Sequence, residues 1–161
     1  MEKPFRQVTI LFLLKDNSIL LAMKKRGFGQ GRWNGVGGKL NLGESVEAAA
    51  IRETQEEINV EPKKIDKVAV IDFYFPPGTP KEDFNQQAHV YFCYEWVGKP
   101  AESEEMRPLW YDLDKIPYEQ MWPDDIFWLP EVISGKKIEA SFNFDIDDAV
   151  IEHKIVEITN L

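Results

Sequence analysis

Cysteine is nearly absent from this sequence, and long apolar runs are absent altogether. Cys93 is the single cysteine among 161 residues, so no disulfide can form within the chain, and its apolar neighbours predict an ordinary packing role. No hydrophobic stretch approaches the roughly 18 residues that suggest a membrane span. Residues 1–6 lack the apolar stretch and cleavage site of a secretory signal. These absences predict a cytoplasmic protein without a membrane partner.

Basic residues are also in the minority. Lys and Arg number 19 against 28 Asp and Glu, which gives a net charge of −9. Proteins that hold nucleic acids by the phosphate backbone need basic patches, so we expect no nucleic-acid partner. Small polyphosphate ligands stay open, because divalent cations can lie between carboxylates and phosphates. The alternative is an acidic surface that serves solubility without any site.

Repeats, low-complexity tracts and interdomain linkers are missing as well. A length of 161 residues is enough for one sizeable core, so we expect a single domain over residues 1–161. No additional segment demands a second copy of the chain, so we also expect a monomer.

The patterns that are present predict strands and helices in mixed order. We expect strands at residues 7–14, 19–23, 68–75, 89–96 and 109–112, a closing hairpin at 138–144 and 149–158, and helices at 45–58 and 126–133. Pro130 is expected near the start of the second helix or at a kink in it. Because strands and helices do not alternate regularly, the pattern favours an α+β or layered α/β domain over a doubly wound sheet.

A glycine-rich segment precedes the first predicted helix. Six glycines fall within residues 27–38, which predicts a loop with close backbone approaches. The helix that follows has Ser45 as a capping residue at its start. Asn59 can adopt the left-handed conformation that ends a helix, and Pro62 prevents its continuation.

Three acidic residues share one face of this predicted helix. Glu53, Glu56 and Glu57 stand at spacings of three and four, which places their Cβ atoms about 5–6 Å apart. Such like charges repel one another, and a hard divalent cation, Mg²⁺ or alternatively Mn²⁺, would reverse the repulsion. The alternative is a solvated acidic stripe.

The acidic face belongs to a longer pattern. In order, the chain carries Gly38, five residues, Glu44, seven residues, Arg52-Glu53, then Glu56-Glu57 and Val60. This resembles the Nudix box, G-x5-E-x7-R-E-U-x-E-E-x-G-U, where U is a bulky aliphatic residue. Six identities at fixed spacing have chance odds of about 10⁻⁵ at average composition. We therefore set aside the alternative that the acidic face is only a solvated stripe. Thr54 and Asn59 depart from the pattern; Thr54 adds a hydroxyl that needs a partner, and Asn59 is a mild change.

The resemblance implies a fold and a metal-dependent hydrolysis. The fold is an α/β/α sandwich around a mixed sheet. Metal ligands would be the Gly38 carbonyl, Glu53, Glu56 and Glu57, with Glu105 assisting from outside the box. Arg52 and Glu44 would pair to fix the loop and helix. Bound metals lower the pKa of water that attacks phosphorus, and Glu56, or alternatively Glu53, would orient or deprotonate that water. Lys24 and Lys39 are candidates for phosphate contact, or plain surface lysines.

A second set of motifs is similar to the animal MutT homologues of this family, which hydrolyse oxidised purine nucleoside triphosphates. The similarity covers residues 23–29, 31–35, 37–39, 104–108 and 121–125 and extends over most of residues 9–144. The main departure is a longer loop at residues 76–86. The resemblance implies a purine pocket: Trp122 offers a stacking face, and Phe28, Phe73 and Met106 complete an apolar slot. Asn34 can address a base edge, and Thr9 adds a polar contact or is an ordinary strand threonine.

Asp124 and Asp125 are adjacent carboxylates that suit the recognition of an oxidised base. If both are buried, like charge and desolvation favour keeping one protonated, so that one donates a hydrogen bond and the other accepts one. The alternative is a helix cap before residue 126.

Three functions remain open at this point. The resemblance favours a hydrolase of 8-oxo-dGTP, 2-hydroxy-dATP and related nucleotides, which releases the monophosphate and pyrophosphate. A Nudix hydrolase of another substrate, such as ADP-ribose, a dinucleoside polyphosphate or a methylated purine triphosphate, is the second. A non-catalytic nucleotide-binding protein is the third, and it is disfavoured because Arg52, Glu53, Glu56 and Glu57 are all present.

Overall fold

A computed structural model describes residues 5–161. Residues 1–4, which belong to the segment where we predicted no secretory signal, lie outside the described residues. The elements are β1 (Arg6–Lys15), β2 (Ser18–Lys24), β3 (Trp33–Asn34), α1 (Val46–Ile58), β4 (Glu61–Tyr74), η1 (Pro80–Phe84), β5 (Gln86–Val97), β6 (Met106–Asp112), η2 (Tyr118–Gln120), α2 (Asp125–Ile133), β7 (Lys137–Phe144) and β8 (Val150–Ile158). Within residues 5–161 no helix is both long and apolar enough to cross a membrane.

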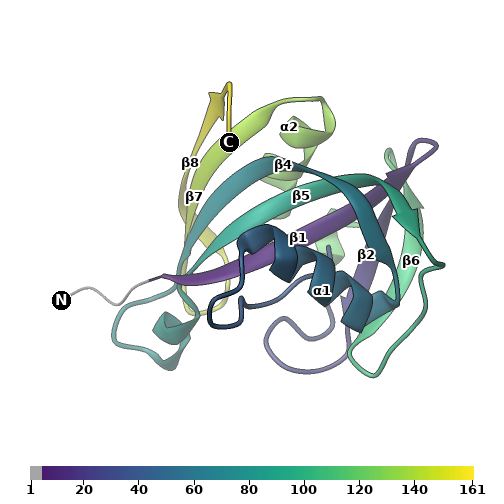
Figure 1. Ribbon diagram of the computed structural model, residues 1–161. Coiled ribbons are helices and arrows are strands. Elements are labelled where there is room, and N and C mark those ends of the chain that lie inside the picture. Colours follow the sequence, from purple (N-terminus) through teal and green to yellow (C-terminus); the bar gives the residue numbers. More distant parts are fainter. Residues whose placement is uncertain (1–4) are drawn as a thin grey trace.

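The strands form one mixed sheet at the centre of the fold. Its order is β3-β2-β1-β5-β4-β7-β8, with β6 paired to β2. The pairs β1–β5 and β4–β7 are parallel, and the pairs β1–β2, β4–β5 and β7–β8 are antiparallel (Figure 1). The predicted closing hairpin is therefore confirmed.

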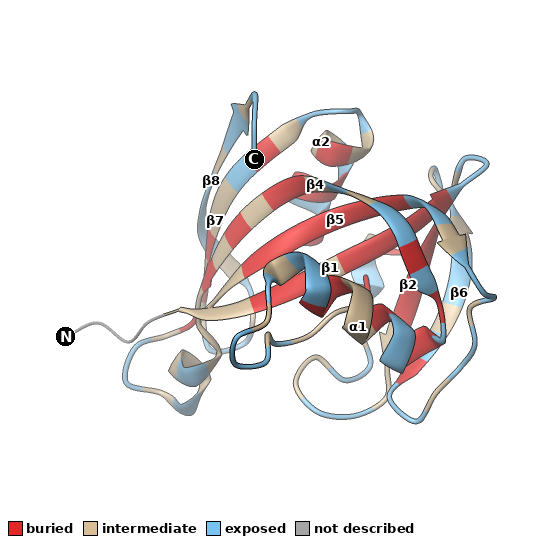
Figure 2. Ribbon diagram, in the orientation of Figure 1, coloured by how far each residue is buried: buried red, intermediate tan, exposed pale blue. Residues whose placement is uncertain are grey.

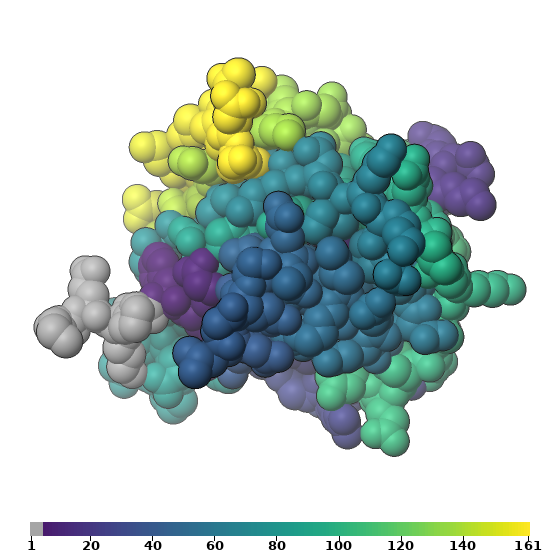
Figure 3. All heavy atoms as spheres, in the orientation of Figure 1, coloured from purple at the N-terminus to yellow at the C-terminus, as the bar shows by residue number. Residues whose placement is uncertain are grey.

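Helices cover both faces of this sheet. Neighbouring residues Phe12 and Leu13 of β1 are both buried because they point to opposite faces. Leu13 belongs to the cluster that includes Ala50 and Ile58 of α1, whereas Phe12 packs in the cluster that includes Trp128 of α2. Buried residues accordingly run along the middle strands (Figure 2), and α1 covers the face seen in the space-filling view (Figure 3). The predicted α/β/α sandwich is confirmed.

Local signals at α1 are confirmed in detail. The Ser45 hydroxyl accepts a hydrogen bond from the Ala48 amide at 3.1 Å, and Asn59 ends the helix in the left-handed region at φ 59°. The Thr54 hydroxyl, buried against the sheet, donates to the Ala50 carbonyl at 2.7 Å. This departure from the Nudix pattern is therefore satisfied within its own helix.

Strand boundaries were the least accurate predictions. β4 begins at Glu61 rather than at residue 68, and its early part pairs with β5 across several register shifts. That part is mostly polar and exposed, so it carries no apolar alternation. β6 begins at Met106 rather than at 109, although Pro108 lies within it.

Two single residues were also predicted. Pro130 lies within α2. Cys93 is a free, fully buried thiol in the core, as its neighbours predicted.

Candidate active site

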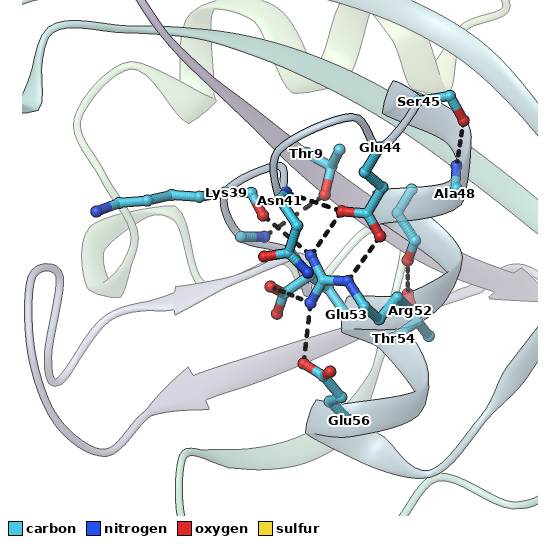
Figure 4. Close-up of polar contacts among 12 residues, drawn as sticks. Thr9, Lys39, Asn41, Glu44, Ser45, Ala48, Arg52, Glu53, Thr54 and Glu56 are labelled. Atoms are coloured by element: carbon cyan, nitrogen blue, oxygen red, sulfur yellow. Dashed lines mark hydrogen bonds and ion pairs between the residues drawn. The ribbon is translucent and has the colours of Figure 1, made fainter.

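Arg52 is the centre of the polar network on α1 (Figure 4). Its guanidinium binds both carboxylate oxygens of Glu44, from Nε at 2.7 Å and from Nη2 at 2.9 Å. Nη2 also donates to the Lys39 carbonyl at 3.1 Å. Nη1 donates to Glu53 at 3.0 Å and to Glu56 at 3.1 Å. Arg52 therefore ties the glycine-rich loop to α1, which is the structural role that its position in the box implied.

This paired geometry changes the acidity of both partners. The hydrogen bonds from Arg52 lower the pKa of Glu44 to about 2, and those bonds in turn raise the pKa of Arg52. A carboxyl whose pKa is lowered on folding contributes stability above its unfolded pKa, 4.5, and loses it as the pH falls through about 2.

We expect Glu44→Gln to lower Tm at pH 6, and we expect this difference from the wild type to shrink as the pH approaches 2. The reason is that protonation removes the same ion pair from the wild type. Differential scanning fluorimetry at pH 6, 4 and 2.5 measures the effect. Glu131→Gln, which removes an exposed ion pair with Lys136, is the control and should change Tm little at any pH. A Tm difference for Glu44→Gln that is independent of pH would contradict the assignment.

Glu53 and Glu57 are the carboxyl groups most removed from water on α1. Glu57 is only 7% exposed, and burial, followed by the charge of Glu53, raises its pKa to about 8. Burial also raises the pKa of Glu53, against the lowering effect of Arg52. The Gly37 amide donates to Glu57 at 3.3 Å. Burial and the charge of Glu53 thus disfavour ionisation of Glu57 beside the glycine-rich loop.

Two glycines of that loop allow the close approach. A Cβ on Gly37 would lie 1.7 Å from the backbone oxygen of Thr9, and one on Gly38 would lie 2.6 Å from the carboxyl group of Glu53. The Gly38 carbonyl accepts a hydrogen bond from the Thr9 amide at 2.9 Å. Strand β1 therefore fixes the loop, and the loop in turn places the Gly38 peptide directly against Glu53.

The donor set at this place suits a hard divalent cation. Carboxylate and carbonyl oxygens are the ligands that such ions prefer, and a cation would relieve the repulsion between Glu53 and Glu57. Within residues 5–161, however, no three acidic, histidine or cysteine side chains already surround a common point. Arg52 binds one oxygen each of Glu53 and Glu56, and the second oxygen of each carboxylate is not used by Arg52. The Glu105 carboxylate, half-exposed and paired with Arg26 at 3.1 Å, raises the pKa of Glu57 through its charge.

A cavity of about 360 Å³ opens beside the glycine-rich loop. All ten residues predicted to bind substrate line it: Thr9, Lys24, Phe28, Asn34, Lys39, Phe73, Met106, Trp122, Asp124 and Asp125. Gly38 lines it too, whereas the glutamates of α1 do not. The structure thus gathers the predicted base-recognition residues into one pocket, and Gly37 and Gly38 connect that pocket to the acidic helix.

Trp122 lies among aromatic rings and one cation. Phe28 is 5.1 Å from it between ring centroids, and Phe144 is 5.8 Å away. The Arg32 guanidinium lies 4.0 Å from the Trp122 ring centroid. These contacts fix the orientation of the indole, which is the condition for a base to stack on a defined face.

Asp124 and Asp125 are both 2% exposed. The Trp128 indole N–H donates to Asp124 at 2.7 Å, whereas Oδ2 of Asp125 has no hydrogen-bond partner within residues 5–161. Burial raises the pKa of Asp124 to about 6, and burial together with the charge of Asp124 raises that of Asp125 well above its usual value. Asp124 stands at the N-cap of α2 but makes no capping hydrogen bond, so the helix-cap alternative is wrong. Burial and the like charge of the two groups thus favour keeping a proton on this pair of carboxyl groups.

Several pocket residues were not predicted from the sequence. These are chiefly Arg6, Arg32, Phe75, Phe84, Gln86 and Phe144. Strand alternation could have revealed Phe75, which follows Phe73 by two residues, and Phe144 by the same reasoning on β7. No sequence signal points to Phe84, which enters the pocket from the longer loop.

Comparisons with known proteins agree with this geometry. The profile of the NUDIX domain family matches residues 3–132. A Danio rerio protein named oxidized purine nucleoside triphosphate hydrolase is 42% identical over 154 residues, covering 96% of each chain. A Mus musculus protein of the same name is 40% identical over 153 residues, covering 95% of this chain and 96% of that one. The crystal structure of a mutator MutT protein from Bacillus halodurans matches with a TM-score of 0.79 at 20% identity. The match covers 94% of this chain and 97% of the Bacillus halodurans chain, and this similarity concerns the fold alone. Together with the loop and acidic helix described above, these matches show that the chain belongs to the Nudix family.

Proposed function

We propose that this protein hydrolyses oxidised purine nucleoside triphosphates, of the 8-oxo-dGTP and 2-hydroxy-dATP type, to the monophosphate and pyrophosphate, and so removes them from the nucleotide pool. The observation that carries the proposal is the pair of buried carboxyl groups, Asp124 and Asp125, in an aromatic pocket beside the loop and helix of the Nudix box. The two animal relatives named as oxidised purine hydrolases support it, since both cover nearly the whole chain.

Nudix hydrolases generally use divalent metal ions, and we propose Mg²⁺ here, with Mn²⁺ as a substitute. The proposed ligands are the Gly38 carbonyl, Glu53, Glu56 and Glu57, and Glu105 assists. Bound metal lowers the pKa of the attacking water and neutralises charge on the transferred phosphoryl group. The support for this site is the oxygen-rich donor set and the raised pKa of Glu57, which follows from burial and then from the charge of Glu53.

The residues of the chain divide the remaining work. Asp125 donates a hydrogen bond to the purine edge and Asp124 accepts one from it. Asn34 and Thr9 add polar contacts. The base plane packs against an apolar slot formed by Trp122, Phe28, Phe73 and Met106. Lys24 and Lys39, both at the pocket, attract the phosphates. Glu56 takes the proton of the attacking water, and Glu53 is the rival for this role. Arg52 holds the loop and helix in register for the attack.

We also propose that residues 1–161 form one domain that acts as a monomer in the cytoplasm. Strands from early and late in the sequence pair within one sheet, which supports a single domain. The single thiol, on Cys93, is free and buried. Light scattering coupled to size-exclusion chromatography would detect a dimer and so overturn the monomer.

The experiment that tests the function compares kcat/KM for 8-oxo-dGTP, 2-hydroxy-dATP and dGTP, with Mg²⁺ and after its removal by EDTA. We expect the oxidised substrates to be preferred, pyrophosphate to be the released product, and activity to disappear without metal. Mg²⁺ should also raise Tm of the wild type, and less so of Glu57→Gln, a measurement that is independent of turnover. Equal or absent activity on all three substrates, with turnover of ADP-ribose or a dinucleoside polyphosphate, would overturn the substrate assignment and leave the Nudix mechanism intact.

A further inference from the structure

The connection between β4 and β5 folds back over the purine pocket. Within it, the 3-10 helix η1 ends at Phe84, whose ring lines the cavity. The Phe84 ring stacks on Phe28, with centroids 4.0 Å apart and planes inclined by only 5°. The Arg6 guanidinium lies 5.2 Å from the Phe84 ring centroid. Phe84 is therefore packed between the glycine-rich loop and the start of β1.

Specific hydrogen bonds hold this connection in place. The Phe75 amide donates to the Asn85 side chain at 2.6 Å, across the two ends of the loop. Within the loop, the Thr79 hydroxyl donates to the Pro76 carbonyl at 2.7 Å. Lys81 reaches the turn between β7 and β8, where it donates to the Ile146 carbonyl at 2.5 Å and pairs with Asp148 at 3.0 Å. The loop is thus anchored at both ends and in its middle.

Asp148 links the loop to the opposite side of the pocket. Besides Lys81, it pairs with Arg32 at 3.4 Å between Nη2 and Oδ2. Arg32 in turn lies over Trp122, and Trp122 contacts Phe28. The side chain of Asp148 is only 18% exposed, so these ion pairs are partly shielded from solvent. Lys81 and Phe84 belong to the same 3-10 helix, η1. From Lys81, contacts run through Asp148, Arg32 and Trp122 to Phe28, which stacks on Phe84.

We propose that Phe84 is a specificity-determining residue for the purine base, and that Asp148 is a positioning residue that acts through Arg32 and Trp122. Phe84 fixes the ring of Phe28 by stacking, and the Lys81–Asp148–Arg32 bridge fixes the indole of Trp122. Together they set the aromatic wall against which a purine packs, before the ligand arrives. A preformed wall favours binding because less side-chain freedom is lost on association. This inference rests on the proposed function, since it concerns recognition of the same base.

The variant Phe84→Leu tests the first part, because it keeps an apolar side chain and removes the ring. We expect KM for 8-oxo-dGTP to rise about threefold to tenfold, as the loss of one aromatic pair predicts, with kcat changed less than about twofold because the wall is remote from the reacting phosphate. Phe84→Tyr, which keeps the ring, should retain the wild-type KM. Phe127→Leu removes a half-exposed ring of α2 that does not line the pocket and is the matched control. Calorimetric binding of 8-oxo-dGMP should weaken by a similar factor, without any turnover.

An unchanged KM in Phe84→Leu, or an equal rise in Phe84→Tyr or in Phe127→Leu, would overturn the inference. For the second part, Asp148→Asn should raise KM in the same direction, and Glu131→Gln, an exposed ion-pair carboxylate, should not. The double variant Phe84→Leu/Asp148→Asn should raise KM by less than the product of the two single-variant factors, because both residues act on one aromatic wall. A KM factor equal to that product would refute the shared wall.

Failure of the proposed function is a separate result. If the wild type hydrolyses no oxidised purine triphosphate, the proposed function is wrong. The same variants are then compared for calorimetric binding of dGMP and AMP. Phe84→Leu should still lower the affinity for the purine nucleotide that the wild type binds. If the wild type prefers 8-oxo-dGTP and Phe84→Leu keeps both KM and the affinity for 8-oxo-dGMP, the inference alone is wrong.

Discussion

Glu56→Gln is expected to lower kcat on 8-oxo-dGTP by about 10²- to 10⁴-fold, the usual contribution of a general base. The amide keeps the shape of the side chain but accepts no proton, so attack of water on phosphorus loses its base. KM should change little, because the pocket that holds the purine is lined by other residues. Steady-state release of pyrophosphate at saturating Mg²⁺ measures the effect.

Two further variants decide which glutamate acts. Glu47→Gln, on the first turn of the same helix and exposed, should keep wild-type kcat and so controls for the loss of one charge from α1. Glu53→Gln should raise the Mg²⁺ concentration needed for half-maximal activity more than Glu56→Gln does. The reason is that Glu53 lies against the Gly38 peptide and is the better placed ligand. If Glu53→Gln loses activity at saturating metal while Glu56→Gln retains it, the roles are reversed.

Predictions from the sequence were accurate wherever the signal was local. The caps at Ser45 and Asn59 and the acidic face of α1 depend on spacings of three and four residues, and the structure contains the helix in that register. The residues that the resemblance selected for the purine pocket are far apart in the chain, and they line one cavity. The position of β4 was wrong at its start, because the pairing of its polar part with β5 depends on a partner strand and on register shifts that no local pattern encodes.

The remaining features depend on contacts between distant segments. Phe84 reaches Phe28 only because the longer loop folds back, and Lys81 and Arg32 meet at Asp148 from three separate parts of the chain. Likewise, spacing placed Glu53 and Glu56 on one face, but it did not indicate that Arg52 would bind both of them. Side-chain partners of this kind follow from packing, which a single sequence does not reveal.

Asp125→Ala is expected to lower the preference for 8-oxo-dGTP over dGTP by about 10- to 100-fold, because a buried hydrogen bond to a polar base edge is lost. Asp124→Ala should lower it as well, whereas Asp125→Asn, which keeps a donor, should lose less. The ratio of kcat/KM values measures the preference. An unchanged ratio in both alanine variants would contradict the assignment of the two aspartates. Asp66→Asn, which neutralises an exposed aspartate paired with Lys137, is the control.

The same pair predicts opposite changes in recognition and stability. As the pH falls through about 6, protonation of Asp124 removes the ionised acceptor, so the preference should fall; titration of the triphosphate cancels in the ratio. A carboxyl whose pKa is raised on folding contributes stability below its unfolded pKa, 3.8, and loses it as the pH rises through the folded value. Asp124→Asn should therefore raise Tm relative to the wild type at pH 8, and raise it less at pH 5, while it weakens recognition. A variant that lost selectivity merely by loosening the fold would show a lower Tm at both values, so the sign of the Tm change separates a recognition residue from a structural one.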